Sequence, residues 1–115
     1  MAKTLSKRET PPDKLSPDQI DRAFKALADP IRRQLLYTLG QPQYYCKQGE
    51  RAVEGMCVRD LAELLKLPQS TVSRHLAVLT QAGLVTLHRD RLWHYYQVDR
   101  DRLNALSLWL TDLGS

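Results

Sequence analysis

The chain has 115 residues, enough for one small domain with a single hydrophobic core. Its composition, 43% hydrophobic and 26% charged, is that of a globular protein, and neither a membrane-spanning stretch nor a secretory signal is present, so we expect a cytoplasmic protein with no membrane partner. The formal net charge of +4 suits a polyanionic partner, although mild basicity is common among proteins.

The first part of the chain divides into a tail and two helices. Residues 1–14 are nearly free of apolar side chains, which predicts a flexible tail followed by one folded domain over residues 15–115. The segment SPDQIDRAFKALA predicts a helix with Ser16 as N-cap and Gln19 completing a capping box. The segment DPIRRQLLYTLG predicts a second helix, which Asp29 caps.

The middle of the chain contains a long connection and two more helices. Residues 40–57 contain Gly40, Pro42, Gly49, Gly55 and both cysteines, which predicts an irregular connection; connections of this length are usually functional or disordered. We expect the cysteines to be thiols, because the chain is predicted to be cytoplasmic. The segment VRDLAELLKL then predicts a short helix, and a second helix is predicted from about Gln69 to Ala82, where Gly83 ends it.

The last part of the chain predicts a hairpin and a final helix. The segments LVTLHR and LWHYYQV are rich in β-branched and aromatic residues and are separated by Asp90 and Arg91. We expect their aromatic residues Trp93, Tyr95 and Tyr96 to pack the sheet against the helices. A helix starting near Asp99 has leucines three and four residues apart, as on a face that packs against another helix; they are Leu103, Leu106, Leu110 and Leu113. Two short helices followed by a hairpin indicate a mainly α fold with a small β-hairpin, the winged helix-turn-helix.

The predicted helix over residues 69–82 has two different faces. Its apolar residues Val72, Leu76 and Leu79 fall within one narrow arc at 100° per residue. The opposite arc has hydroxyl groups and an arginine in place of the usual Glu and Lys, and no carboxylate occurs between residues 68 and 89; its members are Ser70, Arg74, Ala77 and Gln81, with Thr71 and Ser73 beside them. Hydroxyl groups reach phosphates or base edges, and arginine can bind guanine through two hydrogen bonds, so this face predicts DNA binding. The alternative is a merely solvated helix face.

Three further residues belong to the predicted DNA-binding surface. His75 falls at the edge of the apolar arc and is expected at the boundary of the core or on a phosphate, rather than as a metal ligand or catalytic base. Arg89 and Arg91 flank the predicted hairpin tip, where they could enter the minor groove; ordinary turn charges are the alternative.

Three segments of the sequence resemble a known family. They are LADPIRRQLLYTL, CVRDLAELLKLPQSTVSRHLAVLTQAGLV and HRDRLWHYYQV, and they resemble the ArsR/SmtB family of winged-helix repressors from about Ile20 to Leu113. The resemblance implies a homodimer joined through its first and last helices, and release of operator DNA by a metal ion, a metalloid or a thiol-reactive signal. It assigns DNA contacts to Ser70, Thr71, Ser73, Arg74, Arg89 and Arg91. The family often has a glycine where this chain has Arg91, and Asp90 beside it tolerates a left-handed conformation.

The resemblance defines less well which inducer would release the protein from DNA. Arsenic-responsive members often have a Cys-Val-Cys motif with a third cysteine one turn later, whereas this chain has Cys57-Val58-Arg59 and then Ala62. The histidine of zinc-responsive relatives is missing from the last helix as well.

Cys57 nevertheless falls at a predicted helix N-terminus beside Arg59, and both features favour the thiolate. We predict that Cys57 and Cys46 hold a thiophilic metalloid, As(III) or Sb(III), in a two-thiolate site or one shared across the dimer. A disulfide formed by an oxidant is the second hypothesis, and a buried Cys57 with an incidental Cys46 is the third.

The predicted function is therefore a repressor that binds a palindromic DNA operator as a homodimer and needs no obligatory cofactor. A winged helix that binds a protein instead of DNA is the alternative. An enzyme is not expected, because the sequence has no glycine-rich phosphate loop and no recognisable catalytic or metal-hydrolase spacing.

Overall fold

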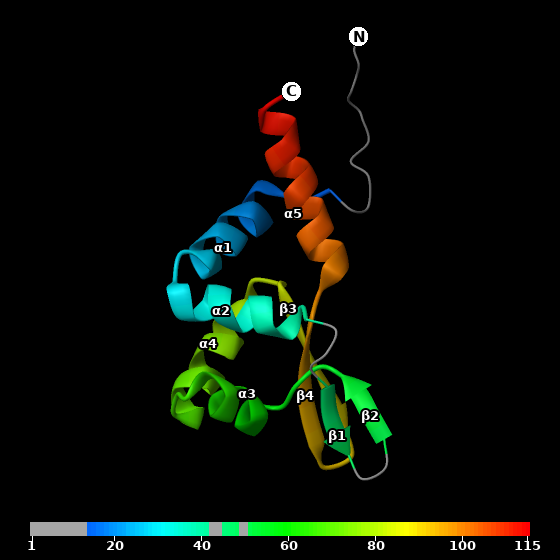
Figure 1. Ribbon diagram of the computed structural model, residues 1–115. Coiled ribbons are helices and arrows are strands. Elements are labelled where there is room, and N and C mark those ends of the chain that lie inside the picture. Colours follow the sequence, from blue (N-terminus) through cyan, green and yellow to red (C-terminus); the bar gives the residue numbers. More distant parts are fainter. Residues whose placement is uncertain (1–13, 42–44, 49–50) are drawn as a thin grey trace.

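The computed structural model describes residues 14–41, 45–48 and 51–115, and describes residues 45–48 and 51–54 by their backbone alone. The predicted tail over residues 1–14 falls outside these residues except for its last position. Figure 1 shows the helices and strands of the described residues along the chain. They are α1 (Pro17–Leu27), α2 (Pro30–Leu39), β1 (Tyr45–Gln48), β2 (Arg51–Glu54), α3 (Val58–Leu65), α4 (Gln69–Gln81), β3 (Val85–Asp90), β4 (Trp93–Val98) and α5 (Arg100–Leu113). Within the described residues, no helix has the length and apolar character needed to cross a membrane.

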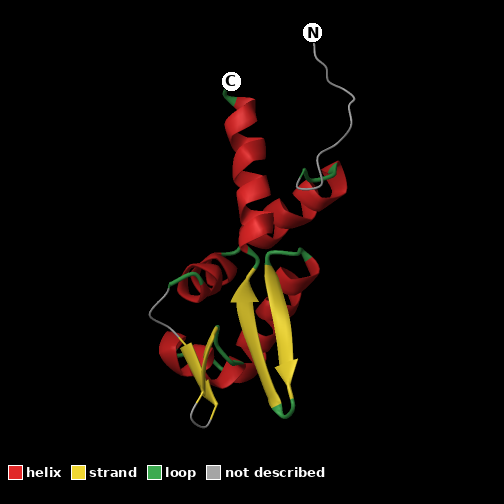
Figure 2. Cartoon of the chain, turned by 90° about the vertical axis from the view of Figure 1, so that its right-hand side faces the viewer, coloured by secondary structure: helices red, strands yellow, loops and turns green. Residues whose placement is uncertain are grey.

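The arrangement confirms the predicted winged helix-turn-helix. Helices α3 and α4 form the helix pair, and β3 and β4 form the antiparallel hairpin that follows it, while α5 extends away from the hairpin (Figure 2). The predicted helix starts are also confirmed. The Ser16 hydroxyl accepts a hydrogen bond from the Gln19 N–H at 3.2 Å, and the Gln19 side chain accepts one from the Ser16 N–H at 2.8 Å. Asp29 caps α2 by accepting from the Ile31 N–H at 2.8 Å.

The core lies between the helices and the base of the hairpin. Its largest fully buried side chains come from α2, α3, α4 and the start of β3; they are Leu35, Leu61, Val72, Leu76, Leu79, Leu84 and Val85. Leu106 of α5 is buried in the same cluster. Helix α4 contributes three of these residues, so its orientation is fixed from one side by the core.

The segment predicted to be irregular, residues 40–57, contains a second hairpin instead. Strands β1 and β2 pair antiparallel with Cys46 opposite Val53, and Met56, the second residue after β2, forms a bridge with Tyr96 of β4. The Met56 N–H donates to the Tyr96 carbonyl at 3.0 Å, and the Tyr96 N–H donates to the Met56 carbonyl at 2.8 Å. The prediction of an irregular connection was wrong because two strands of four residues each leave too short a pattern to be recognised in the sequence.

The tip of the β3–β4 hairpin also differs from the prediction. Asp90 pairs with Trp93 inside the ladder, so the connection is Arg91–Leu92 rather than Asp90–Arg91. Arg91 has φ of 59°, and the left-handed conformation therefore falls on Arg91 and not on Asp90. Leu92 is 97% exposed at this tip.

Candidate nucleic-acid interface

The turn between α3 and α4 leaves the start of α4 open. Lys66 ends α3 in a left-handed conformation with φ of 58°, and the Leu67 N–H returns to the Ala62 carbonyl at 3.0 Å. Pro68 occupies the N-cap position of α4 and provides no side-chain acceptor for the first-turn N–H groups. Because Pro68, Gln69 and Ser70 are exposed, these N–H groups and the positive end of the helix dipole are accessible to an anion such as a phosphate.

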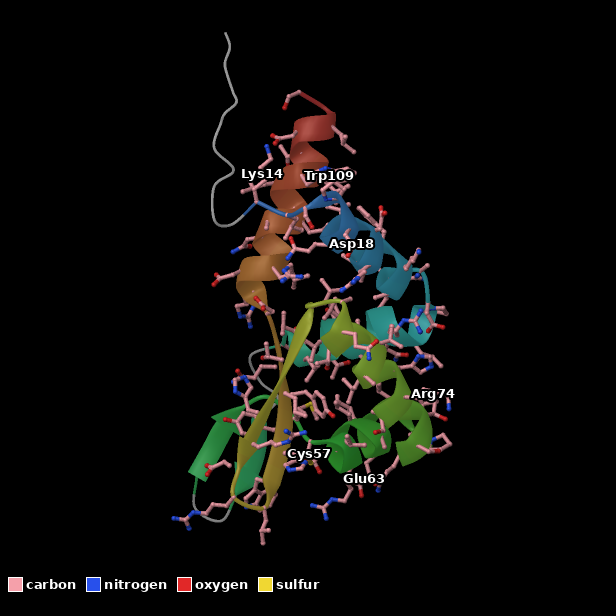
Figure 3. All side chains as sticks on the ribbon, turned by 180° about the vertical axis from the view of Figure 1, so that it is seen from behind. Lys14, Asp18, Cys57, Glu63, Arg74 and Trp109 are labelled. Carbon is pink, nitrogen blue, oxygen red and sulfur yellow. The ribbon has the colours of Figure 1, made fainter. Side chains whose placement is uncertain are left out.

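The two faces of α4 lie as the periodicity predicts. Val72, Leu76 and Leu79 have no exposed surface and form part of the core. The residues of the opposite face are exposed; they are Ser70, Ser73, Arg74, Ala77 and Gln81, and Thr71 beside them is half-buried. Figure 3 shows Arg74 projecting from one side of the molecule. The polar face therefore presents its hydroxyl and guanidinium groups to solvent, with the core holding the helix behind it.

His75 lies at the boundary of the core, as expected, and contacts α2. Its Nδ1 accepts a hydrogen bond from the Arg32 guanidinium at 3.1 Å, because a guanidinium can only donate. The same Arg32 donates from Nε to the Ala26 carbonyl at 2.7 Å and lies 3.9 Å from the Asp29 carboxylate.

The neighbours of Asp29 change the pKa of its carboxyl group. Partial burial raises its pKa, but hydrogen bonds from the Arg32 and Ile31 N–H groups and the charge of Arg32 outweigh burial, so the pKa lies below its ordinary value. Sequence reasoning identified Asp29 as a cap but missed Arg32, whose partners come from α1, α2 and α4. The network fixes the start of α2 against the middle of α4.

The β3–β4 hairpin exposes Arg89 and Arg91 near its tip, which agrees with their predicted accessibility. Of the three aromatic residues expected to pack against the helices, Tyr96 does so. Trp93 is instead exposed near the tip, and Tyr95 stacks on His88 with ring centroids 5.2 Å apart. The expectation was wrong for Trp93, because it lies at the tip of the hairpin, and for Tyr95, because consecutive residues of a strand point to opposite faces and Tyr96 occupies the face toward the core.

Comparison with known proteins agrees with this arrangement. The family model described as "Bacterial regulatory protein, arsR family" matches residues 51–86, which include α3 and α4. The arsenical resistance operon repressor of Bacillus subtilis is 35% identical over 86 residues, which cover 75% of this chain and 71% of that protein. The chain belongs to the arsR family. The sequence-based assignment to this family is thus confirmed.

Solved structures of ArsR-type proteins have the same fold. The homodimeric winged helix-turn-helix DNA-binding domain from Mycobacterium bovis, a possible ArsR-family regulator, is 31% identical with a TM-score of 0.58, covering 83% of this chain and 80% of that chain. An ArsR-like regulator from Rhodococcus sp. RHA1, at 23% identity and a TM-score of 0.68, covers 84% of this chain and 80% of that chain and supports the fold alone. The arsR family consists of transcriptional regulators, so this chain is a regulator and not an enzyme.

The two cysteines of this ArsR-family chain belong to different parts of the fold. Cys57 is the N-cap residue of α3, is half-buried and is a free thiol. Cys46 lies on β1, opposite Val53, and its side chain is outside the described part of the chain. No cluster of three or more metal-ligating side chains occurs among the residues whose side chains are described. A three-donor metalloid site therefore cannot be assembled from the described residues of one chain.

Proposed function

We propose that this ArsR-family protein is a cytoplasmic repressor that binds a palindromic DNA operator as a homodimer. The proposal depends on one observation about the two faces of α4. Its apolar face is fully buried, while its polar face, which has no carboxylate, is exposed. Such a face can enter the major groove without repelling the phosphates. The proposed DNA contacts are Ser70, Thr71, Ser73, Arg74 and His75 on α4, and Arg89 and Arg91 on the wing.

The proposed contacts differ in what they recognise. The hydroxyl groups and N–H groups at the start of α4 suit phosphate oxygens, and the Arg74 guanidinium can bind guanine O6 and N7 together. Arg89 and Arg91 at the hairpin tip suit the negative potential of the minor groove. Arg74 would then determine sequence preference, and the other contacts would position the protein.

The proposed dimer uses the outer parts of α1 and α5. Phe24 of α1 and Trp109 of α5 are in ring contact, with centroids 5.5 Å apart. Beyond this contact the α5 residues Leu110 and Leu113 are 49% and 66% exposed in the single chain. A second copy would cover these leucines, and the homodimeric state of the Mycobacterium bovis domain supports a dimer. A dimer would place its two α4 helices about 34–36 Å apart for successive major grooves.

The inducer we propose is a thiophilic metalloid, As(III) or Sb(III), with Cys57 and Cys46 as thiolate donors. Support comes from the free thiol at the start of α3 and from the arsenical resistance repressor among the relatives. Because one chain has two cysteines, the site has two thiolates or is shared between subunits. Occupation of Cys57 would act on α3, which packs against α4.

Fluorescence anisotropy with the DNA upstream of the protein's own gene tests DNA binding. We expect strong salt dependence and preference for a palindrome over a scrambled duplex. Arg74→Ala is expected to weaken operator binding about 5- to 150-fold for each guanine that Arg74 binds through two hydrogen bonds. Arg59→Ala is the control, because Arg59 is an exposed arginine next to the start of α3. No binding of the wild type to any duplex at low salt would overturn the proposal in favour of a protein-interaction module.

The inducer is tested on the same complex. Arsenite or antimonite should release DNA from the reduced wild type, whereas Cys57→Ser should bind DNA normally and resist release. Retention of normal release by Cys57→Ser would refute the assignment. Release by peroxide but not by arsenite would support the disulfide mechanism instead.

A further inference from the structure

A basic groove lies between α1, α2 and α4, outside the surface assigned to DNA so far. Its volume is about 570 Å³, and it is lined by Arg22, Lys25, Ala26, Arg32, Val78, Gln81 and Ala82. Ala26 and Ala82 are buried, so small side chains form its floor. Its charged side chains come from α1 and from the start of α2.

The two exposed cations of the groove, Arg22 and Lys25, retain the capacity to bind an anion. The Arg22 side chain is 63% exposed and pairs with the exposed carboxylate of Asp18 at 3.0 Å, which leaves other N–H donors of its guanidinium open. Lys25 is exposed and has no ion pair among the described residues. Arg32 lies deeper, paired with Asp29, and three cations thus outnumber the two neighbouring carboxylates.

The groove is continuous with the polar face of α4. Gln81 belongs both to that face and to the lining of the groove, and Arg32 contacts His75 in the middle of α4. Figure 3 shows Arg74 on the same side of the molecule as the connection between α1 and α2, whereas Lys14 lies on the other side. DNA lying on α4 would therefore have its backbone close to the groove.

We propose that the basic groove formed by Arg22, Lys25 and Arg32 binds a DNA phosphate, so that the DNA contact extends from α4 to α1. The proposal rests on the proposed function and adds a contact on the side of α4 that faces away from the wing. Cations that touch only phosphate add affinity without sequence preference and make it more dependent on salt.

The test is the salt dependence of DNA binding by the full chain carrying Arg22→Gln and Lys25→Gln together. Removal of one phosphate interaction per subunit lowers the slope of log K against log salt by about 0.9, hence by about 1.8 for a dimer. If the curves meet at 1 M salt, the affinity at 0.1 M falls about 60-fold, equally for operator and scrambled duplex.

Two further variants separate the groove from net charge and from folding. Lys14→Gln with Arg59→Gln removes the same kinds of charge elsewhere and should keep the wild-type slope. The double variant Arg22→Lys with Lys25→Arg keeps both charges and should therefore also keep the wild-type slope of log K against log salt. An unchanged slope for the glutamine variant of the groove, or a decrease in affinity confined to the operator, would overturn the proposal. If the wild type binds neither duplex, the proposed function itself fails.

Discussion

Replacing Leu110 by glutamine is expected to weaken the proposed dimer without unfolding the chain. Leu110 lies on α5 and is 49% exposed in the single chain, so about half of its surface remains to be covered. Full burial of a leucine is worth about 1.5–3 kcal/mol, and half of it about 0.7–1.5 kcal/mol per subunit. With two copies per dimer, the loss of about 1.5–3 kcal/mol raises the dimer Kd about 10- to 150-fold.

Sedimentation equilibrium over a range of protein concentrations measures this Kd directly. Leu64→Gln is the matched control, because Leu64 on α3 is 43% exposed but lies away from α5. Thermal unfolding of both variants checks that the fold is intact. The reasoning is refuted if Leu110→Gln dimerises as tightly as the wild type, or if Leu64→Gln weakens the dimer equally.

Four further single substitutions have expected effects on stability or DNA binding. Leu76→Ala removes a fully buried core residue and should lower the free energy of unfolding by about 2–5 kcal/mol in urea. Gly55→Ala should lower it by about 1–3 kcal/mol, because φ is 129° and a Cβ would lie 2.5 Å from the Tyr96 carbonyl oxygen. Asp29→Asn should destabilise the fold at pH 7. The lowered pKa means that the carboxylate stabilises above its ordinary pKa and loses this effect on acidification, so thermal melts of variant and wild type should converge below about pH 4. Arg91→Gly should relieve the positive φ and raise the thermal midpoint, while anisotropy should show weaker DNA binding with a smaller salt slope.

The helices could be predicted from sequence because their signals are local. Ser16 with Gln19 and Asp29 with the following proline mark helix starts through side-chain acceptors within three residues. The period of the apolar residues also identified the buried face of α4, because the same 100° step that places Val72 inward places Arg74 outward. The sequence therefore predicted correctly which face of α4 is exposed.

The β1–β2 hairpin was missed because the local sequence of residues 40–57 indicates a loop and not two strands. Its strands are four residues long, and the chain after them is held by the bridge between Met56 and Tyr96. The glycines of the segment indicate a loop when considered alone. Arg32 was missed for a similar reason, since nothing in the sequence near it indicates a partner at His75.

The structure limits how a signal at Cys57 could reach DNA. The end of α4 is fixed to the base of α5, because the Arg102 guanidinium donates to the Ala82 carbonyl at 3.2 Å and the Asp99 N–H donates to the Leu84 carbonyl at 2.9 Å. Gly83 between them has φ of 79°, and a side chain there would collide with Arg102. Since the C-terminal end of α4 is held to the helix proposed to dimerise, a change at the start of α3 acts on the opposite, N-terminal part of α4. Release of DNA would then come from tilting α4 about its fixed end, which moves Ser70 and Arg74 more than Gln81.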